Sequence, residues 1–157
     1  MTNHSQNLKN NFYFKKILKF CSLSIRSEYE VLQKLDNFEQ IDPELKEEIL
    51  NFFIKLRVVV SDADYLRYYL ENLSQSKGYT YNQLFLKLSK KVKNQSLLKN
   101  TLKEFFTQNG DSQIIRFIER NERKLRRMDT TQKRIQYLTQ KGFQFNLIKE
   151  NLPKYNL

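Results

Sequence analysis

Three short segments decide the fold of this chain: SEYEVLQKL at residues 27–35, TYNQLFLKL at 80–88 and TTQKRIQYL at 130–138. They align without gaps, and their final leucines lie 53 and 50 residues apart. Each segment begins with a serine or threonine, and in the first two a glutamate or glutamine follows three residues later, as in a helix capping box. Self-similarity at a fixed period indicates repeats in which each segment begins a short helix.

Longer segments with apolar residues at helical spacing flank each of these three. The upstream helices are expected at residues 12–23, 62–73 and 113–128, and the downstream ones at 43–56, 97–106 and 145–152. The predicted fold is therefore all-α, an elongated array of three tandem three-helix repeats with Leu35, Leu88 and Leu138 in the core. The repeats are expected at residues 12–60, 61–110 and 111–157, after a disordered N-terminal head at residues 1–11.

The composition excludes several classes of protein. The 157 residues include only three glycines and two prolines, too few for a β-sandwich and too widely spaced for a glycine-rich phosphate loop. The single cysteine, Cys21, cannot form a disulfide within the chain, so we expect it in the core of a protein from the reducing cytoplasm. No apolar stretch approaches the roughly 20 residues that span a bilayer. We expect a cytoplasmic monomer that does not associate with membranes.

The charge of the chain indicates an anionic partner. Lys and Arg number 28 against 17 Asp and Glu, a formal net charge of +11. The excess is C-terminal, because residues 1–60 carry nine basic and eight acidic side chains whereas residues 111–157 carry eleven and five. Six of the nine arginines fall between positions 116 and 134. Such an excess favours polyanions or acidic protein surfaces as partners.

The predicted helix at 113–128 has one apolar and one basic side. On a helical wheel its apolar side chains lie opposite an arginine comb, which consists of Arg116, Arg120, Arg123 and Arg127, with Lys124 beside it. Guanidinium groups bind phosphate or carboxylate in bidentate fashion. A face that is merely solvated would mix both signs more evenly, whereas here only Glu119 and Glu122 interrupt the bases. We predict that the comb binds a partner.

A second basic cluster follows the short helix of the middle repeat and includes Lys87, Lys90 and Lys91. Two readings stay open for it: a second binding site, or lysines that merely suit the negative end of a helix dipole. Tyr79 and Tyr81 precede this helix and either stack on nucleic-acid bases or pack on the core.

The sequence offers few groups for catalysis. The sole histidine, His4, falls in the expected disordered head. Ser61, Asp62 and Asp64 either hold a cation or cap the following helix, and capping is the commoner role of such residues. We therefore expect no catalytic residue, no metal site and no cofactor, and we predict that the protein is not an enzyme.

Three motifs, in order, carry a resemblance to a known family. They are RSEYEVLQKL at 26–35, SDADY at 61–65 with Lys77-Gly78 after it, and KRIQYLTQKGFQFNLI at 133–148. These resemble the patterns R-S-x-x-E-L-x-x-K-L, D-D-x-x-F/Y-A and K-x-x-x-F/Y-L-x-x-R-G-F-x-x-x-x-I of the RecX family, over residues 14–152. The chain departs from the family pattern at Ser61, Leu66 and Lys91.

The resemblance implies a non-enzymatic regulator of the RecA recombinase, with a place in DNA repair, DNA recombination and the SOS response. Such a protein binds RecA and the RecA filament on single-stranded DNA and suppresses its ATPase, recombinase and coprotease activities. The alternative is a sequence-nonspecific nucleic-acid-binding helical protein that acts without RecA and loses affinity steeply as salt rises. Whether the basic residues meet RecA or DNA stays open.

Overall fold

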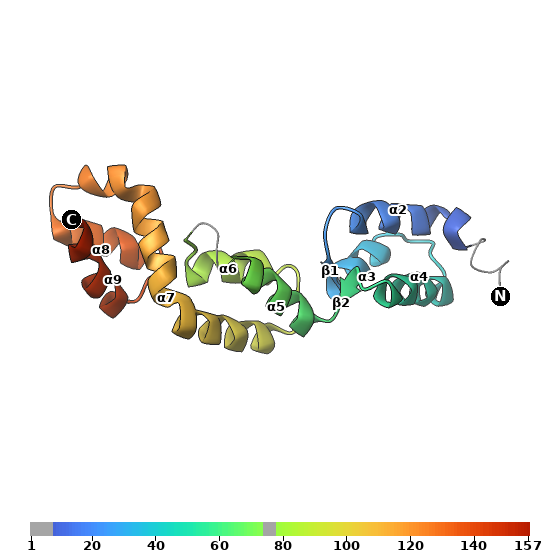
Figure 1. Cartoon of the computed structure of the whole chain (residues 1–157). Helices are drawn as coiled ribbons and strands as arrows, with labels where there is room; N and C mark the ends of the chain where they lie inside the picture. The colour runs from blue at the N-terminus through green and yellow to red at the C-terminus, as the bar shows by residue number, and fades with distance from the viewer. Residues whose placement is uncertain (1–7, 74–77) are drawn as a thin grey trace. The chain divides into compact units, whose positions relative to one another are not determined.

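The computed structural model describes residues 8–73 and 78–157, and nearly all of its regular structure is helical (Figure 1). The all-α fold class is confirmed. The chain divides into two compact units, of which the first runs to Arg67 and includes Lys90–Asn94. The second contains Tyr68–Ser89 and Gln95–Leu157. In the described part of the chain, no helix is both long and apolar enough to cross a bilayer.

The first unit contains α2 (Phe12–Cys21), α3 (Glu28–Asp36) and α4 (Pro43–Lys55). Each begins after a polar residue whose side chain accepts backbone N–H groups of the first turn. These caps are Asn11, Ser27 with its complete capping box, and Asp42. The apolar faces meet in one core, where Phe14 stacks on Phe53 with ring centroids 5.1 Å apart. Cys21 is buried in that core, as predicted.

One feature of the first unit was not predicted, a parallel pair of very short strands. β1 (Arg26–Ser27) pairs with β2 (Val59–Val60), with Arg26 opposite Val59. The pairing brings the residues before α3 against the chain that leaves α4. α5 (Asp62–Leu73) follows β2 directly.

The second unit contains α6 (Tyr81–Leu88), α7 (Gln95–Arg126), α8 (Thr131–Gln140), α9 (Phe145–Asn151) and the 3₁₀ turn η1 (Leu152–Tyr155). Thr80 forms the predicted capping box with Gln83, and Thr130 caps α8. The three predicted core leucines, Leu35, Leu88 and Leu138, are fully buried. The short helices therefore bury their repeated leucines in the core, as expected.

The helices predicted at 97–106 and 113–128 are in fact one helix, α7. The intervening TQNGDS resembles a turn, but the side chains of Thr107, Asn109 and Ser112 donate to carbonyls of the same helix, as Asn109 Nδ2 does to Phe105 at 3.0 Å. Gly110 is buried, and a Cβ there would lie 3.1 Å from Cδ1 of Leu147, so the glycine lets α9 pack closely. α7 changes direction where its colour passes from yellow to orange (Figure 1). The boundary expected at 110/111 thus falls inside a helix, and the division into three repeats stays a prediction.

The predicted disordered head requires a partial correction. Residues 1–7, with His4, lie outside the described residues. For residues 8–11 the structure differs from the expectation, because Leu8 is buried in the first core and Asn11 caps α2. A short apolar anchor followed by a cap orders this part of the chain.

Candidate functional site

The second half of α7 presents its two predicted faces. Ile114, Ile118 and Leu125 are fully buried against α8 and α9 in the core of the second unit. On the opposite side Arg120, Arg123 and Arg127 are exposed, with Lys124 beside them, while Arg116 is half-buried. The helical-wheel assignment of the faces is confirmed.

The acids of this helix are engaged away from the comb. Glu122 pairs with Arg126 at 2.6 Å, and Glu119 accepts a hydrogen bond from the Tyr155 hydroxyl at 3.2 Å. Burial and then the nearby Glu119 raise the pKa of Tyr155 above its ordinary value. Among the described residues, no carboxylate pairs with Arg120, Arg123 or Arg127. Arg120, Arg123 and Arg127 therefore present positive charge that no carboxylate among residues 8–73 and 78–157 neutralises in an ion pair.

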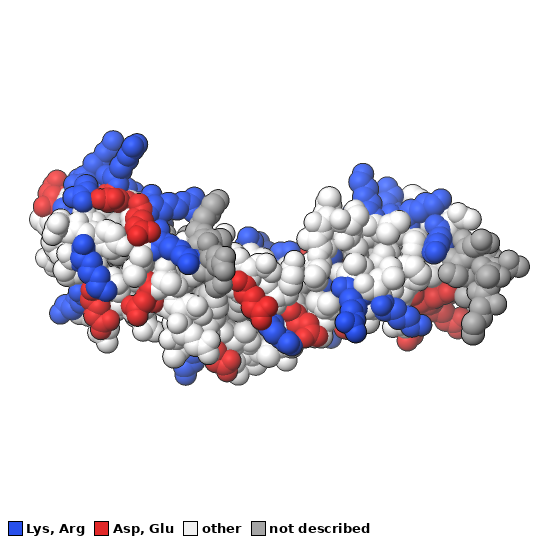
Figure 2. All heavy atoms as spheres, viewed as in Figure 1, with Lys and Arg blue, Asp and Glu red and all other residues white. Residues whose placement is uncertain are grey.

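The second unit also contains a hollow of about 520 Å³, which we call the basic groove. Among the residues that the structure describes, three cationic side chains line it, from α6, from α7 and from the residue after α8, and no carboxylate does. The described lining is Gly78, Tyr79, Gln83, Lys87, Phe117, Arg120, Asn121, Tyr137 and Lys141. Figure 2 shows Lys and Arg side chains gathered over the last turns of α7, next to this region. The structure thus brings Lys87 of the second predicted cluster to Arg120 of the comb.

Aromatic rings hold the lysines of the basic groove. Lys124 Nζ lies 4.3 Å from the ring centroid of Tyr137, and Lys141 Nζ lies 5.4 Å from the same centroid. Lys87 Nζ lies 6.0 Å from the ring centroid of Tyr79. Cation–π contacts of this kind restrict flexible lysine side chains, so the positive charges are partly organised before any ligand arrives.

Two glycines shape the basic groove: Gly78 lines it, and Gly142 ends the helix that precedes Lys141. A Cβ at Gly78 would collide with main-chain atoms of Gln113 and Phe117, so only glycine lets this loop lie directly on α7. Gly142 has a φ of +96° and ends α8, where the Phe143 N–H donates to the Leu138 carbonyl at 3.2 Å. That turn buries Phe143 and places Lys141 at the groove.

Lys91, predicted as a binding residue, is paired inside the first unit. Its ammonium lies 2.6 Å from Glu30, which also faces Arg26 at 3.5 Å. The Ser27 hydroxyl donates to the Lys91 carbonyl, and the ring of Tyr65 lies 5.8 Å from Lys91 Nζ. Burial by itself lowers the pKa of Lys91, but the hydrogen bond and charge of Glu30 and the contact with Tyr65 outweigh it and raise the pKa. We call this set the Glu30 cluster.

Lys90 is exposed and belongs, like Lys91, to the first unit. Of the second predicted cluster, therefore, only Lys87 lies in the basic groove.

The basic groove and the Glu30 cluster occupy related positions in the sequence. Glu30 and Gln83 are both the fourth residue of an aligned segment, and both close a capping box. Lys91 follows Leu88 by three residues, as Lys141 follows Leu138. The fourth position of the segment therefore holds an acid that pairs with a lysine in the first unit, and a neutral amide in the basic groove.

In the Ser61–Asp64 segment, Ser61 caps the following helix, α5, whereas the Asp62 carboxylate binds backbone groups just before α7. Asp62 accepts the backbone N–H groups of Lys93 at 2.7 Å and Asn94 at 2.9 Å. Ser61 accepts the N–H of Asp64, whose carboxylate pairs with Arg67. Within residues 8–73 and 78–157, no three His, Cys, Asp or Glu side chains group as metal ligands. Burial raises the pKa of Cys21 to about 11, so its thiol stays protonated at neutral pH.

Several groove residues were not among the predicted site residues. Tyr137 and Lys141 belong to the third motif quoted above, so the motif itself marked them. Gln83 was identified only as part of a helix capping box. No local sequence pattern predicts Asn121 as a site residue, because only the packing of α7 brings it to the groove.

Comparison with known proteins supports the fold. No protein-family model matches the sequence, and no curated protein matches it significantly. The structure, by contrast, is similar to the crystal structure of RecX from Lactobacillus salivarius, with a TM-score of 0.68 and 20% sequence identity. The similarity covers 97% of this chain and 98% of that chain. The chain therefore has a RecX-like fold.

Proposed function

We propose that this protein is a non-enzymatic modulator of RecA, which binds RecA and its filament on single-stranded DNA and inhibits it. The observation that carries the proposal is the RecX-like fold along 97% of the chain. The basic groove supports it independently, because a filament of protein on DNA offers both acidic side chains and phosphates.

The proposed contact surface joins the comb to the basic groove. Its residues are Arg116, Arg120, Arg123, Lys124, Arg127, Lys87 and Lys141. The surface does not include Lys90 and Lys91, which were predicted to bind. Arginine forks match carboxylate or phosphate oxygens in two parallel hydrogen bonds. The neutral amides of Gln83 and Asn121 can donate to the same anion without adding negative charge.

Inhibition requires that the protein binds one state of the filament better than another. A ligand shifts an equilibrium only by the difference in its affinity for the two states. We therefore propose that the basic surface binds best to a filament arrangement that hydrolyses ATP slowly or releases protomers. Suppression of ATPase, recombinase and coprotease activities would then share one cause.

The test is the single-stranded-DNA-dependent ATPase of the RecA from the same organism, titrated with this protein at fixed DNA and salt. We expect inhibition at less than one protein per RecA protomer, and we expect it to survive excess DNA. The double variant Arg120→Glu/Arg123→Glu should lose inhibition while circular dichroism shows unchanged helicity. Inhibition by the folded double variant equal to wild type would remove the comb from the mechanism.

A second candidate function is nonspecific binding of single-stranded nucleic acid without RecA. The rings of Tyr79 and Tyr137 among three cations favour it, because such grooves combine phosphate contacts with base stacking. In that case excess DNA would erase the ATPase inhibition, and binding to an oligonucleotide alone would fall steeply with salt.

A further inference from the structure

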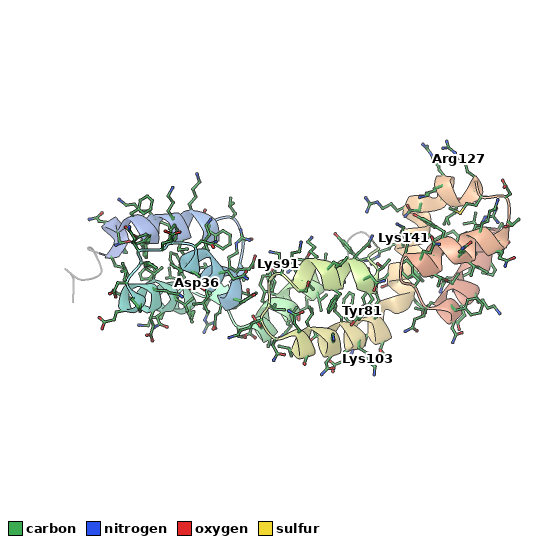
Figure 3. The ribbon with its side chains drawn as sticks, turned by 180° about the vertical axis from the view of Figure 1, so that it is seen from behind. Asp36, Tyr81, Lys91, Lys103, Arg127 and Lys141 are labelled. Atoms are coloured by element: carbon green, nitrogen blue, oxygen red, sulfur yellow. The ribbon has the colours of Figure 1, made fainter. Side chains whose placement is uncertain are left out.

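The second unit has another groove, separate from the basic one. It is about 680 Å³ in volume and lies where α6 begins, against the first half of α7, the Gly142 turn and α9. We call it the lysine-rimmed groove, and its lining is Tyr81, Asn82, Lys99, Asn100, Lys103, Phe106, Thr107, Gly142, Phe143, Gln144 and Leu147. It shares no lining residue with the basic groove. In Figure 3, Lys103 points to the side of this unit away from Lys141 and Arg127.

The floor of the lysine-rimmed groove is apolar and preformed. The ring of Tyr81 is parallel to that of Phe85 at 6.2 Å and contacts Phe106 at 6.0 Å. Leu147 is held against Gly110 of α7. Because these side chains are already packed on one another, the hollow does not need to form on binding. Its volume is in the range of sites that enclose a few side chains of a ligand.

The described residues of the rim carry positive charge or neutral polar groups. Lys99 and Lys103 lie one turn apart on α7, are exposed, and form no ion pair with a described residue. Asparagine, glutamine and threonine side chains complete the rim, and none of the described lining residues is a carboxylate. Glu104, the residue after Lys103, lines an adjacent hollow with it. An apolar floor beneath two ammonium groups is complementary to an apolar side chain flanked by carboxylates.

We propose that the lysine-rimmed groove docks a short acidic segment of a partner protein. One aromatic or aliphatic side chain of that segment lies on the floor, and carboxylates on either side meet Lys99 and Lys103. The chain's own residues 1–7, MTNHSQN, contain no acid and do not fit this description. A nucleic-acid strand fits less well, because no arginine is among the described lining residues and the ring of Tyr81 is already stacked on Phe85.

The test begins with a library of short synthetic peptides. Each has phenylalanine, leucine or tyrosine at its centre and varies among Asp, Glu, Asn, Gln, Lys and Arg at the flanking positions. Peptides retained by the immobilised full-length protein should be enriched in Asp and Glu beside the apolar residue. Retention without that enrichment, or no retention, would overturn the proposal. Neither RecA nor DNA is present, so the result is independent of the proposed function.

The most enriched peptide is then labelled with fluorescein, and its affinity is measured by anisotropy. The variant Lys99→Glu/Lys103→Glu should weaken binding at least about tenfold. The matched control is Lys15→Glu/Lys19→Glu, which makes the same charge change at the same spacing on exposed positions of α2 and should change affinity less than about twofold.

Two outcomes of the anisotropy experiment would contradict the proposal. Equal losses in the two double variants would mean that the peptide responds only to net charge. Displacement of the peptide by an oligothymidylate from the wild-type protein, but not from the Lys99→Glu/Lys103→Glu variant, would assign the groove to nucleic acid. Circular dichroism of both variants checks that the helices are intact.

Discussion

The Glu30 cluster of the first unit and the basic groove of the second both place cations on aromatic rings. In the first, Arg26 lies 4.1 Å from the ring centroid of Phe20 and Lys91 lies against Tyr65. In the second, the ring of Tyr137 lies near two lysines. The first contains the carboxylate of Glu30, whose counterpart among the described residues of the groove is the amide of Gln83. The comparison teaches that the same position of an aligned segment can hold the acid of an internal ion pair or a neutral amide beside cations.

The largest expected effect is on the wall of the basic groove. Gly78→Ala places a Cβ into main-chain atoms of α7, which cannot move aside, so the free energy of unfolding should fall by at least about 3 kcal/mol. Urea denaturation followed by circular dichroism measures the loss. The control is Gly110→Ala, where only the end of Leu147 is near and alanine favours the helix, so the net change should be within about 1 kcal/mol. Equal effects would show that the loop does not lie on α7.

Next in size is the removal of the acid from the Glu30 cluster. Glu30→Gln keeps a residue that completes the capping box but leaves Arg26 and Lys91 without a counter-charge. Because the Glu30 side chain is only 10% exposed, we expect a loss of about 1–3 kcal/mol in unfolding free energy. Glu39→Gln, at an exposed loop position, should cost less than about 0.5 kcal/mol in the same urea titration. A Glu30→Gln variant as stable as the control would mean that the ion pair does not stabilise the fold.

The converse substitution adds a carboxylate to the basic groove. Gln83→Glu keeps the capping box and puts a carboxylate among Lys87, Arg120 and Lys141, so stability should change by less than about 1 kcal/mol. The protein concentration that half-inhibits the RecA ATPase should rise about tenfold, because the added acid competes with the anionic ligand. Gln132→Glu, the same charge change at an exposed position of α8, serves as the control. Unchanged inhibition by Gln83→Glu would place the binding surface elsewhere.

The smallest expected effect is a pH dependence of the first unit. The folded-state pKa of Lys91 is raised above its ordinary 10.5, so its ion pair contributes stability below that pH and loses it as the pH rises through the folded value. The stability difference between wild type and Lys91→Met, whose wild-type lysine side chain is 24% exposed, should be constant to about pH 10 and shrink above 10.5. Lys93→Met, at an exposed position, should show no such change. A difference that persists at high pH would indicate packing rather than charge.

Local signals in the sequence predicted most of the fold. The caps Ser27, Thr80 and Thr130 and the three repeated leucines need only their near neighbours, and the structure confirms them. The continuity of α7 was not predicted, because an Asn-Gly pair ordinarily marks a turn and only the packing of Leu147 on Gly110 overrides it. The strand pair was missed because each strand has two residues and their partners lie far apart in the chain.

The candidate site was predictable only where one helix contains it. Arg120, Arg123 and Arg127 share a face of α7, so helical periodicity was enough. Lys87 and Lys91, by contrast, are close in the sequence but belong to different units, and only the fold shows that Lys91 already has an acid. The meeting of Lys87, Arg120 and Lys141 depends on loops whose path is set by Gly78 and Gly142.

The first unit takes Lys90–Asn94 from a stretch of chain that otherwise belongs to the second. A fragment that ended at residue 67 would lack the lysine that pairs with Glu30 and the backbone N–H groups that Asp62 accepts. No single cut of the chain therefore separates the first unit from the second. A gene duplication or deletion of one repeat period would also have to include Lys90–Asn94, the segment that the next period contributes to the first unit. Each period therefore depends in evolution on the one that follows it.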